Sequence, residues 1–408
     1  MREPFLETEL SYLSTYFHKV YLLVPKQPEN ISHTINFKLP PNVIVAQFND
    51  KPTFIQKLLG LKVIFTYRFW KEISIIKLNY NLKLNRQILK ILMSSLIRSL
   101  YFAQQIKKFL KSNHIPFHRT TLYTYWCNEY SAGIGIFRKK YKVAGAFTRV
   151  HNWDLYFERA DHNYLPLRSF IHKTLDATFV VSEQTKNYIL KKNPYINEDK
   201  LLVNYLGVEK IAEPLLNNKG KKLKILSLAF LGKVKRIDMV VAALEMIENI
   251  EIEWHHIGQG NDHLDLKQYA FNHLFNKSNI RYVITGDIPK KNVYEYLKKE
   301  HFDVLINTSS FEGVPVSMME AMSFSIPVIG TNVGGVSEII DDGKNGYLLP
   351  ANPSTKEIVD TLNKLYLLSD EDYLIMRNNA YQTWKNKFNA EYNYPELAYN
   401  MLQFSKNR

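Results

Sequence analysis

Cysteine is almost absent from this chain, which holds one such residue, Cys127, among 408. A single thiol excludes a disulfide framework and a cysteine-rich zinc site, and it agrees with a reducing compartment. Long apolar runs are also lacking, because no stretch of about 18 apolar residues and no signal peptide is found. The sequence therefore predicts neither a membrane span nor a secretion signal. With 46% hydrophobic residues, it predicts a globular chain long enough for two α/β domains.

Acidic residues are scarce in one long segment. Between Lys51 and Arg119 the only acid is Glu72, against fourteen basic residues, and the whole chain has a net charge of +14. Such a segment attracts anionic lipid at about 1 kcal/mol per basic residue near the surface, or nucleic acid without specificity. The alternative interpretation is that the whole chain is simply rich in lysine and that this segment has no binding role. Because aromatic and apolar residues are interleaved with the charge, the pattern favours an anionic membrane surface, and no specific nucleic acid is expected.

The residues from 311 to 349 are the most informative part of the sequence. They follow a buried-strand pattern at residues 302–308, and a helix is expected to begin near Pro315, whose fixed φ suits a first helical position. Backbone amides at a helix N-terminus lack acceptors and attract phosphate. The expected unpaired amides are those of Gly313, Val314 and Val316.

Two glutamates flank this helix start. Glu312 precedes it, and Glu320 lies one turn inside it. Helical side chains lean towards the N-terminus, so the Glu320 carboxylate is expected to reach the same mouth as Glu312. Carboxylates accept hydrogen bonds from neighbouring sugar hydroxyls, which predicts a ligand with both a phosphate and many hydroxyls.

Glu312, seven residues and then Glu320, set within FEGVPVSMMEAM and followed by PVIGTNVGGVSEII, closely resemble the retaining glycosyltransferases of family 4. The resemblance implies the α/β GT-B fold, in which two Rossmann-like domains face each other across a cleft. It also implies that Glu312 contacts the donor sugar, that Glu320 contacts the nucleotide ribose, and that the amides of residues 313–316, Pro315 excepted, contact phosphate. An ordinary strand, loop and helix with exposed glutamates is the alternative interpretation.

Polar residues also follow the strand predicted at residues 143–149, where open α/β sheets bind ligands. The segment TRVHNWDLYFER resembles one in a subgroup of the same glycosyltransferases. By that likeness, His151 faces the cleft near the donor sugar and is a catalytic candidate. The alternative is a structural surface histidine.

A basic loop follows the strand predicted at residues 224–231 and holds Lys235 and Arg236, which are positioned to pair with a diphosphate. The family commonly has an arginine after this strand and a lysine five residues later. Here Phe230 takes the arginine position and Lys235 the lysine position, and Arg236 is the candidate to replace the missing charge. A solvated basic loop is the alternative. A later pair, Gly258 and Gly260, resembles the Gly-x-Gly that lines the nucleotide in the family.

The resemblance divides the chain into four parts. We predict an acceptor-side Rossmann-like domain (1–208), a linker (209–222), a nucleotide-sugar-binding Rossmann-like domain (223–383) and a C-terminal helix that crosses back to the first domain (384–408). In the family a first strand and a glycine-containing loop precede the helix predicted at residues 3–17. Their apparent lack here would remove a central strand and part of the cleft wall.

These features predict a retaining, hexosyltransferase-type glycosyltransferase that moves a sugar from a UDP- or GDP-sugar to a glycan or lipid-linked acceptor in bacterial surface polysaccharide synthesis. No metal or cofactor is expected, because Lys235, Arg236 and the helix N-terminus supply positive charge for the leaving diphosphate. The expected location is cytoplasmic, peripheral at the inner face of the cell membrane. A catalytically impaired sugar-nucleotide-binding or membrane-associated scaffold protein is the alternative, favoured by Phe230 and by the lacking strand. The sugar, base, acceptor and oligomeric state stay open.

Overall fold

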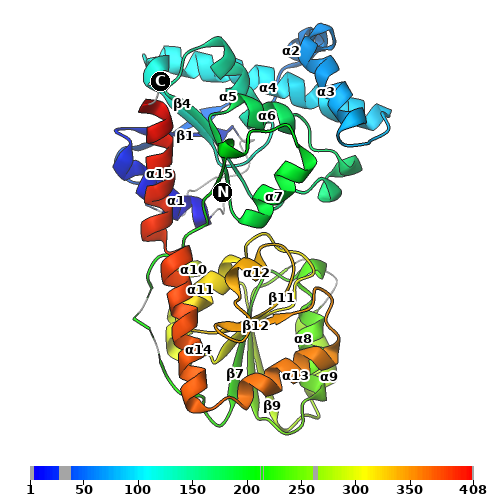
Figure 1. The fold of residues 1–408 in the computed structure, drawn as a ribbon, viewed down its shortest axis with the longest axis vertical. Helices are drawn as coiled ribbons and strands as arrows, with labels where there is room; N and C mark the ends of the chain where they lie inside the picture. The colour runs from blue at the N-terminus through cyan, green and yellow to red at the C-terminus, as the bar shows by residue number, and fades with distance from the viewer. Residues whose placement is uncertain (1–3, 27–37, 212, 215, 261–264, 407–408) are drawn as a thin grey trace. The chain divides into compact units, whose positions relative to one another are not determined.

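The chain forms two compact α/β units, as seen in a computed structural model (Figure 1). The first unit comprises Met1–Tyr205 and Tyr394–Arg408, and the second comprises Leu206–Asn393. Each unit holds parallel β-sheets, which confirms the predicted fold class. The structure describes residues 4–26, 38–211, 213–214, 216–260 and 265–406.

The first unit contains eight of the described α-helices and six described strands. The α-helices are α1 (Pro4–Tyr16), α2 (Phe54–Gly60), α3 (Tyr67–Leu78), α4 (Arg86–Ser112), α5 (Glu129–Lys140), α6 (Arg168–Thr174), α7 (Glu183–Lys192) and α15 (Ala390–Lys406), which begins in the second unit. Short 3₁₀ turns are η1 (Leu61–Phe65), η2 (Phe117–Arg119), η3 (Phe157–Arg159), η4 (Asp161–Asn163) and η5 (Glu198–Lys200). The strands are β1 (Val20–Pro25), β2 (Val43–Phe48), β3 (Thr121–Thr124), β4 (Gly145–Val150), β5 (Ala177–Val180) and β6 (Leu201–Val203).

These strands form two parallel sheets, β1-β2 and β3-β4-β5-β6. Every residue of β4 and β5 is buried, whereas β1 and β3 are half-buried along their whole length. Parallel strands covered on both faces read as continuous apolar runs, which is why residues 143–149 and 177–181 were recognisable as strands. In the described part of the chain, no backbone pairing joins β1 to β3. The lacking central strand stays a prediction.

Residues 53–80 lack a clear pattern in the sequence, yet they fold into α2, η1 and α3. The reason is that several of their large apolar side chains face solvent, Phe54, Phe65 and Leu78 among them. Outward-facing apolar residues erase the 3.6-residue periodicity on which a helix prediction depends. Among the described helices, none is both long enough and apolar enough to cross a bilayer.

A buried ion pair ties the N-terminal helix to the sheet. The Arg149 guanidinium, at the end of β4, lies 2.8 Å from the Glu9 carboxylate of α1, and both side chains are fully buried. Arg149 also donates to the carbonyls of Asn204 and Tyr205. These bonds satisfy a charge that burial would otherwise make costly, so α1 is fixed by electrostatics as well as by apolar contact.

The second unit holds seven described α-helices besides the start of α15, and one six-stranded sheet. The α-helices are α8 (Ile237–Met246), α9 (Leu266–Leu274), α10 (Lys290–Glu300), α11 (Val316–Ser323), α12 (Val336–Ile339), α13 (Thr355–Tyr366) and α14 (Asp370–Thr383). A 3₁₀ turn, η6 (Lys233–Lys235), precedes α8, and a π-helical turn, η7 (Trp384–Phe388), follows α14. The strands are β7 (Leu223–Leu228), β8 (Ile252–Ile257), β9 (Ile280–Gly286), β10 (Val304–Asn307), β11 (Val328–Thr331) and β12 (Gly346–Leu349).

The six strands are all parallel, in the order β12-β11-β10-β7-β8-β9. In Figure 1, α8, α9 and α13 cover one face of this sheet and α10, α11 and α14 cover the other. Chain order runs outward in one direction from β7 and in the other from β10, so the switch point of the sheet lies between these two strands. Open α/β sheets bind ligands at the carboxyl ends of strands beside that point.

We expect Glu9→Gln to lower the free energy of unfolding by about 3–5 kcal/mol, because it leaves the buried Arg149 charge without its ion-pair partner. Urea unfolding measures the change. Glu198→Gln is the control, since Glu198 pairs with Lys186 with its side chain 63% exposed and a surface pair contributes about 1 kcal/mol or less. Equal losses in the two variants would show that the buried pair has no special role.

Candidate functional site

Two loops meet at the switch point of the second sheet. The first follows β7 and contains η6, and the second joins β10 to α11. The Ser310 amide donates to the Val234 carbonyl over 2.7 Å, and the Thr308 hydroxyl donates to the carbonyls of Lys235 and Arg236 over 3.1 and 2.9 Å. Because β7 and β10 are paired neighbours, the loops that leave their carboxyl ends are held together by these bonds.

Glu312 lies at the centre of this contact. Its Oε1 is 2.5 Å from the Lys235 ammonium, and it accepts hydrogen bonds from the Ser309 hydroxyl (2.6 Å) and the Asn307 side-chain amide (3.1 Å). The Glu312 side chain is buried, whereas that of Lys235 keeps about a quarter of its surface exposed. The structure therefore brings two predicted residues, 77 positions apart in sequence, into direct contact, with the lysine able to meet a ligand.

The turn before α11 places backbone amides beside this pair. The helix begins at Val316, and Pro315 precedes it as the cap, one residue earlier than its expected role as the first helical residue. In the described part of the chain, no protein acceptor is recorded for the amides of Gly313, Val314 and Val316. Unpaired amides at the start of a helix attract anions, so this turn can bind phosphate.

The turn at residues 334–335 packs against the Glu312 loop. The Gly335 amide donates to the Gly313 carbonyl over 2.6 Å, and Gly334 has a φ of +54°. A Cβ at Gly334 would lie 1.8 Å from the Glu312 carbonyl oxygen, so only glycine permits this approach. Gly334 is thus required for the shape of the Glu312 loop.

Glu320 lies within α11 and is buried. It accepts a hydrogen bond from the Tyr294 hydroxyl over 2.9 Å, and the Lys290 ammonium of α10 lies 3.9 Å away. Burial raises the pKa of Glu320, while Lys290 and Tyr294 act in the opposite direction. The structure thus pairs Glu320 with α10, in an environment where a lost partner would be costly.

The Arg236 guanidinium bonds to other loops of the protein. Its guanidinium donates to the carbonyls of Thr308, Ser309 and Ala351 and to the Asn352 side chain. Its backbone is left-handed, with a φ of +48°. These contacts use Arg236 to hold three loops in place, so the diphosphate contact stays a prediction for this residue.

The glycines after β8 are fixed by close packing. A Cβ at Gly258 would lie 1.9 Å from the Ala229 carbonyl oxygen, and one at Gly260 would lie 1.8 Å from that of Leu231. The Gly258 amide donates to the Gly286 carbonyl over 2.9 Å. The loop after β8 therefore lies directly on the loop after β7, next to Lys235.

His151 belongs to the first unit, just past the end of β4. Its ring contacts those of Tyr125 and Trp126, with centroids 4.6 and 4.5 Å away. The ring bonds to the Tyr125 backbone, whereas the buried Nε2 has no protein partner. Burial, helped by the Arg149 charge, holds the pKa of His151 well below its usual value. A neutral ring with an unpaired, buried nitrogen can accept a hydrogen bond from a ligand hydroxyl.

Some residues of both sites were not singled out in the sequence. Asp154 accepts bonds from the amides of His151 (2.8 Å) and Cys127 (2.7 Å), which fixes two loops at the carboxyl ends of β3 and β4, and burial raises its pKa to about 6. Asn307 and Ser309 hold Glu312. Their signal was available, since Asn307 is the last residue of a buried strand and Asp154 and Ser309 follow one closely.

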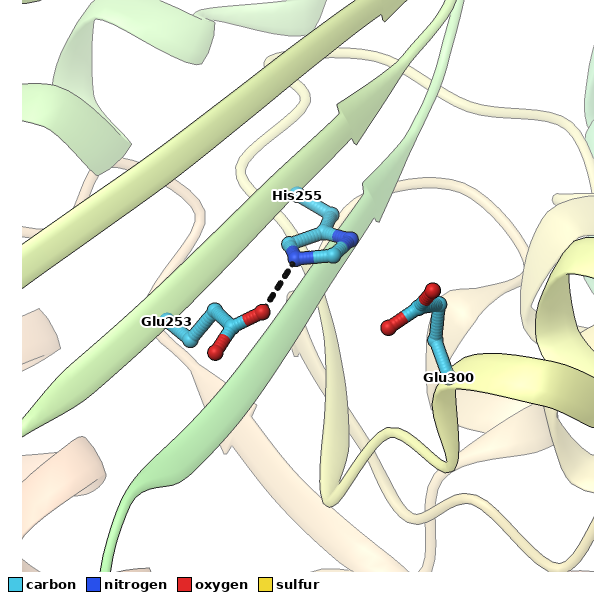
Figure 2. A group of neighbouring side chains, drawn as sticks. All are labelled: Glu253, His255 and Glu300. Carbon is cyan, nitrogen blue, oxygen red and sulfur yellow. Dashed lines mark hydrogen bonds and ion pairs between the residues drawn. The ribbon is translucent and has the colours of Figure 1, made fainter.

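A third group of side chains is drawn in Figure 2. Glu253 and His255 of β8 and Glu300 of α10 place possible metal-ligand atoms within 4.8 Å of one another. Each already has a protein partner, because His255 lies 3.0 Å from Glu253 and 2.7 Å from the Tyr296 hydroxyl, and Glu300 lies 3.5 Å from Lys224. These contacts join β8 to α10, so the group has a structural role in the second unit without any ion.

Solved structures define the class of fold. Sucrose-phosphate synthase from Thermosynechococcus elongatus covers 100% of this chain and 94% of its own, with a TM-score of 0.68 and 15% identity. Anabaena HepE in complex with UDP-glucose covers 73% and 88%, with a TM-score of 0.54 and 14% identity. At these identities the likeness concerns the fold alone: the chain has the GT-B fold of two Rossmann-like domains.

The comparison with protein families concerns the second unit. Residues 209–383 match the family model of glycosyl transferases group 1. N-acetyl-alpha-D-glucosaminyl L-malate synthase of Bacillus anthracis is 28% identical over 180 residues, 43% of this chain and 45% of that protein. The UDP-N-acetylglucosamine--peptide N-acetylglucosaminyltransferase GtfA subunit of Streptococcus pneumoniae is 26% identical over 194 residues, 46% of this chain and 36% of that protein. The aligned stretches span less than half of these relatives, and they support the glycosyltransferase superfamily.

The buried His151 predicts a pH dependence. Its folded pKa lies well below the ordinary value of 6.5, so below that pH the unfolded chain binds the extra proton and stability falls. We expect the free energy of unfolding to lose about 1.4 kcal/mol through this residue by about pH 5.5. Urea unfolding at about pH 7.5 and 5.5 measures the loss, which His151→Gln should remove. The exposed His118→Gln should keep it, and equal slopes in His151→Gln and wild type would contradict the assignment.

Proposed function

We propose that this chain is a retaining glycosyltransferase of family 4 that moves a sugar from a nucleotide-diphosphate sugar to an acceptor hydroxyl. The contact between Lys235 and Glu312, 2.5 Å apart beside the unpaired amides of Val314 and Val316, is the observation that carries this proposal. It joins a cation, a carboxylate and phosphate-binding amides at the switch point of a parallel sheet. A phosphate bonded to a polyhydroxylated sugar needs all three.

In the proposed reaction, the bond from the sugar carbon to the diphosphate oxygen breaks as a bond to the acceptor oxygen forms on the same face. The acceptor proton passes to the departing phosphate oxygen, so no protein nucleophile takes part. Negative charge grows on the diphosphate, and Lys235 together with the amides at the start of α11 stabilises it. These groups supply positive charge without a metal ion, which is the basis for proposing a metal-independent enzyme.

Each carboxylate has a distinct role in this proposal. Glu312 orients the donor hydroxyls, because Asn307 and Ser309 hold its carboxylate in one position. Glu320 accepts from the nucleotide ribose, and Tyr294 fixes its orientation. His151 accepts from a sugar hydroxyl through its unpaired Nε2. Gly258 and Gly260 let the nucleotide approach the backbone of their loop.

UDP- or GDP-sugar is the proposed donor, and a glycan or lipid-linked acceptor of surface polysaccharide synthesis is the proposed acceptor. The printed names and titles of relatives and neighbours, which include UDP-N-acetylglucosamine and UDP-glucose, support a nucleotide-sugar donor. The basic segment from Lys51 to Arg119 supports a peripheral location at the inner face of a bacterial cell membrane. A transfer assay with a panel of UDP- and GDP-sugars tests the activity.

A sugar-nucleotide-binding protein with impaired catalysis is the second candidate. Phe230, in the loop after β7, is 63% exposed and stands where the family commonly has arginine. Arg236 is engaged by backbone carbonyls, so of the two predicted cations only Lys235 reaches Glu312. Binding of a nucleotide sugar without transfer or hydrolysis across the whole panel would favour this candidate.

Glu320→Ala should weaken nucleotide binding by about 1–3 kcal/mol, because buried ribose contacts would lose their acceptor. Isothermal titration with UDP and GDP measures the affinity. The matched control is Glu371→Ala, at an exposed position in the first turn of α14. Unchanged affinity in Glu320→Ala would refute the ribose assignment.

Lys235→Ala should reduce turnover by about 10²–10³-fold, which is the cost of removing one electrostatic contact to a leaving group. Its thermal midpoint should change little, because the lysine is partly exposed. Transfer kinetics and a thermal melt measure both quantities, with the exposed Lys356→Ala as the control. A collapsed melting temperature with normal turnover per folded molecule would assign Lys235 a structural role instead.

A further inference from the structure

A hollow of about 380 Å³ opens in the first unit, between α3 on one side and α5 and α6 on the other. This volume falls in the range of small-ligand sites, about 300–1,000 Å³. Four cations line it, with Arg68 and Lys71 from α3, Lys139 from α5 and Lys173 from α6. Two of them lie over one aromatic ring, since Arg68 and Lys139 are 4.6 and 5.6 Å from the Phe170 centroid.

These cations have no acidic counterpart at the surface. Among the described residues, no carboxylate forms an ion pair with any of the four. The single acid of the wall, Glu72, is only 2% exposed and already accepts bonds from the Tyr164 hydroxyl (3.0 Å) and the Leu167 amide (2.9 Å). Four positive side chains around a hollow, with the nearest acid turned inward and satisfied, attract an anion.

The position of the hollow separates it from the candidate catalytic residue of the same unit. Lys139 lies in the last turn of α5, before β4 begins, and Lys173 lies in the last turn of α6, before β5 begins, so both stand near the amino ends of strands. His151 follows the carboxyl end of β4. In a parallel sheet these ends lie at opposite edges, so the hollow is a site of its own.

The surface beside the hollow is aromatic. Phe65 is 83% exposed, Tyr67 is 78% exposed and Trp70 is 60% exposed, with Phe54 and Leu78 also open to solvent. Figure 1 shows α2 and α3, which carry most of these residues, at the outside of the first unit. Basic residues are interleaved with them, and Lys71 lies over the Tyr67 ring at 5.4 Å. Exposed aromatic rings between lysines are typical of a surface that enters the interface of a bilayer.

We propose that this hollow binds the phosphate headgroup of an anionic phospholipid while Phe65, Tyr67 and Trp70 enter the bilayer interface around it. The cations neutralise the headgroup, and the aromatic rings give apolar contact that a free inorganic anion would not use. The surface therefore fixes which side of the first unit faces the membrane. This inference deepens the proposed peripheral location, and it does not depend on the sugar-transfer chemistry.

Co-sedimentation with vesicles tests the headgroup site. Wild type should bind phosphatidylcholine vesicles that contain phosphatidic acid or phosphatidylglycerol, and not pure phosphatidylcholine. Lys139→Gln with Lys173→Gln should weaken binding roughly thirty-fold, since each basic residue contributes about fivefold near an anionic surface. Lys356→Gln with Lys385→Gln changes the net charge equally, at exposed positions of the second unit, and should cost less than about threefold. Equal losses in the two double variants would overturn the site.

Fluorescence tests the insertion of the aromatic residues. Vesicles with brominated acyl chains should quench tryptophan emission of wild type, and Trp70→Phe should remove most of that quenching. Persistent quenching in Trp70→Phe would overturn the proposed orientation.

Two further measurements separate the other anions. Inorganic phosphate that stabilises wild type without any vesicle binding would identify a free-anion site and overturn the lipid. An oligonucleotide that binds more tightly than the vesicles, with the same loss in the hollow variant, would do the same. Titration with UDP and GDP on all variants keeps the two proposals apart, because the hollow variants should bind these nucleotides as wild type does. A failed transfer assay would contradict the proposed sugar transfer and would leave the vesicle result unchanged.

Discussion

The ion pair between Lys235 and Glu312 is the contact on which the candidate site depends. It joins two loops that are 77 residues apart in sequence, and both leave the carboxyl ends of neighbouring parallel strands, β7 and β10. Asn307 and Ser309 fix the carboxylate, and Gly334 allows the supporting turn to approach it. Because these partners hold Glu312 in advance, a ligand has to displace or share only the lysine. A preorganised acceptor beside unpaired amides is what a charged, hydroxyl-rich ligand requires.

In the first unit, too, a buried carboxylate joins two loops at the carboxyl ends of parallel strands. Asp154 accepts the amides of His151 and Cys127 and so joins the loops after β3 and β4. Tyr125 and Trp126 then surround the His151 ring, and burial keeps it neutral. In both units, therefore, a buried carboxylate orders the polar loops at the carboxyl edge of a parallel sheet. The candidate ligand-binding groups are positioned by neighbours that are themselves buried, namely Asn307, Ser309 and Asp154.

The one acid of the basic segment is buried. Glu72 is the single acid between residues 51 and 119, and its carboxylate is used inside the protein by Tyr164 and Leu167. The surface of that segment therefore carries lysines, arginines and aromatic rings without negative charge among them. The same outward-facing aromatic residues interrupt the helical periodicity of α2 and α3, and they are the residues proposed to enter a bilayer interface.

Local sequence was sufficient to predict the strands and the helix start that have a clear local pattern. Continuous apolar runs indicated β4, β5 and β10, and Pro315 placed a helix start within one residue of Val316. The same helix start put Glu312 and Glu320 at its two sides, whereas the GT-B fold was expected from the resemblance to a known family. Tertiary structure alone decided that Lys235 meets Glu312, that Arg236 turns to the carbonyls of Thr308 and Ser309, and that Glu72 turns inward. The physical reason is that a strand or helix is selected by neighbours within a few residues, whereas the partner of a charged side chain is selected by whichever distant loop the sheet brings to it.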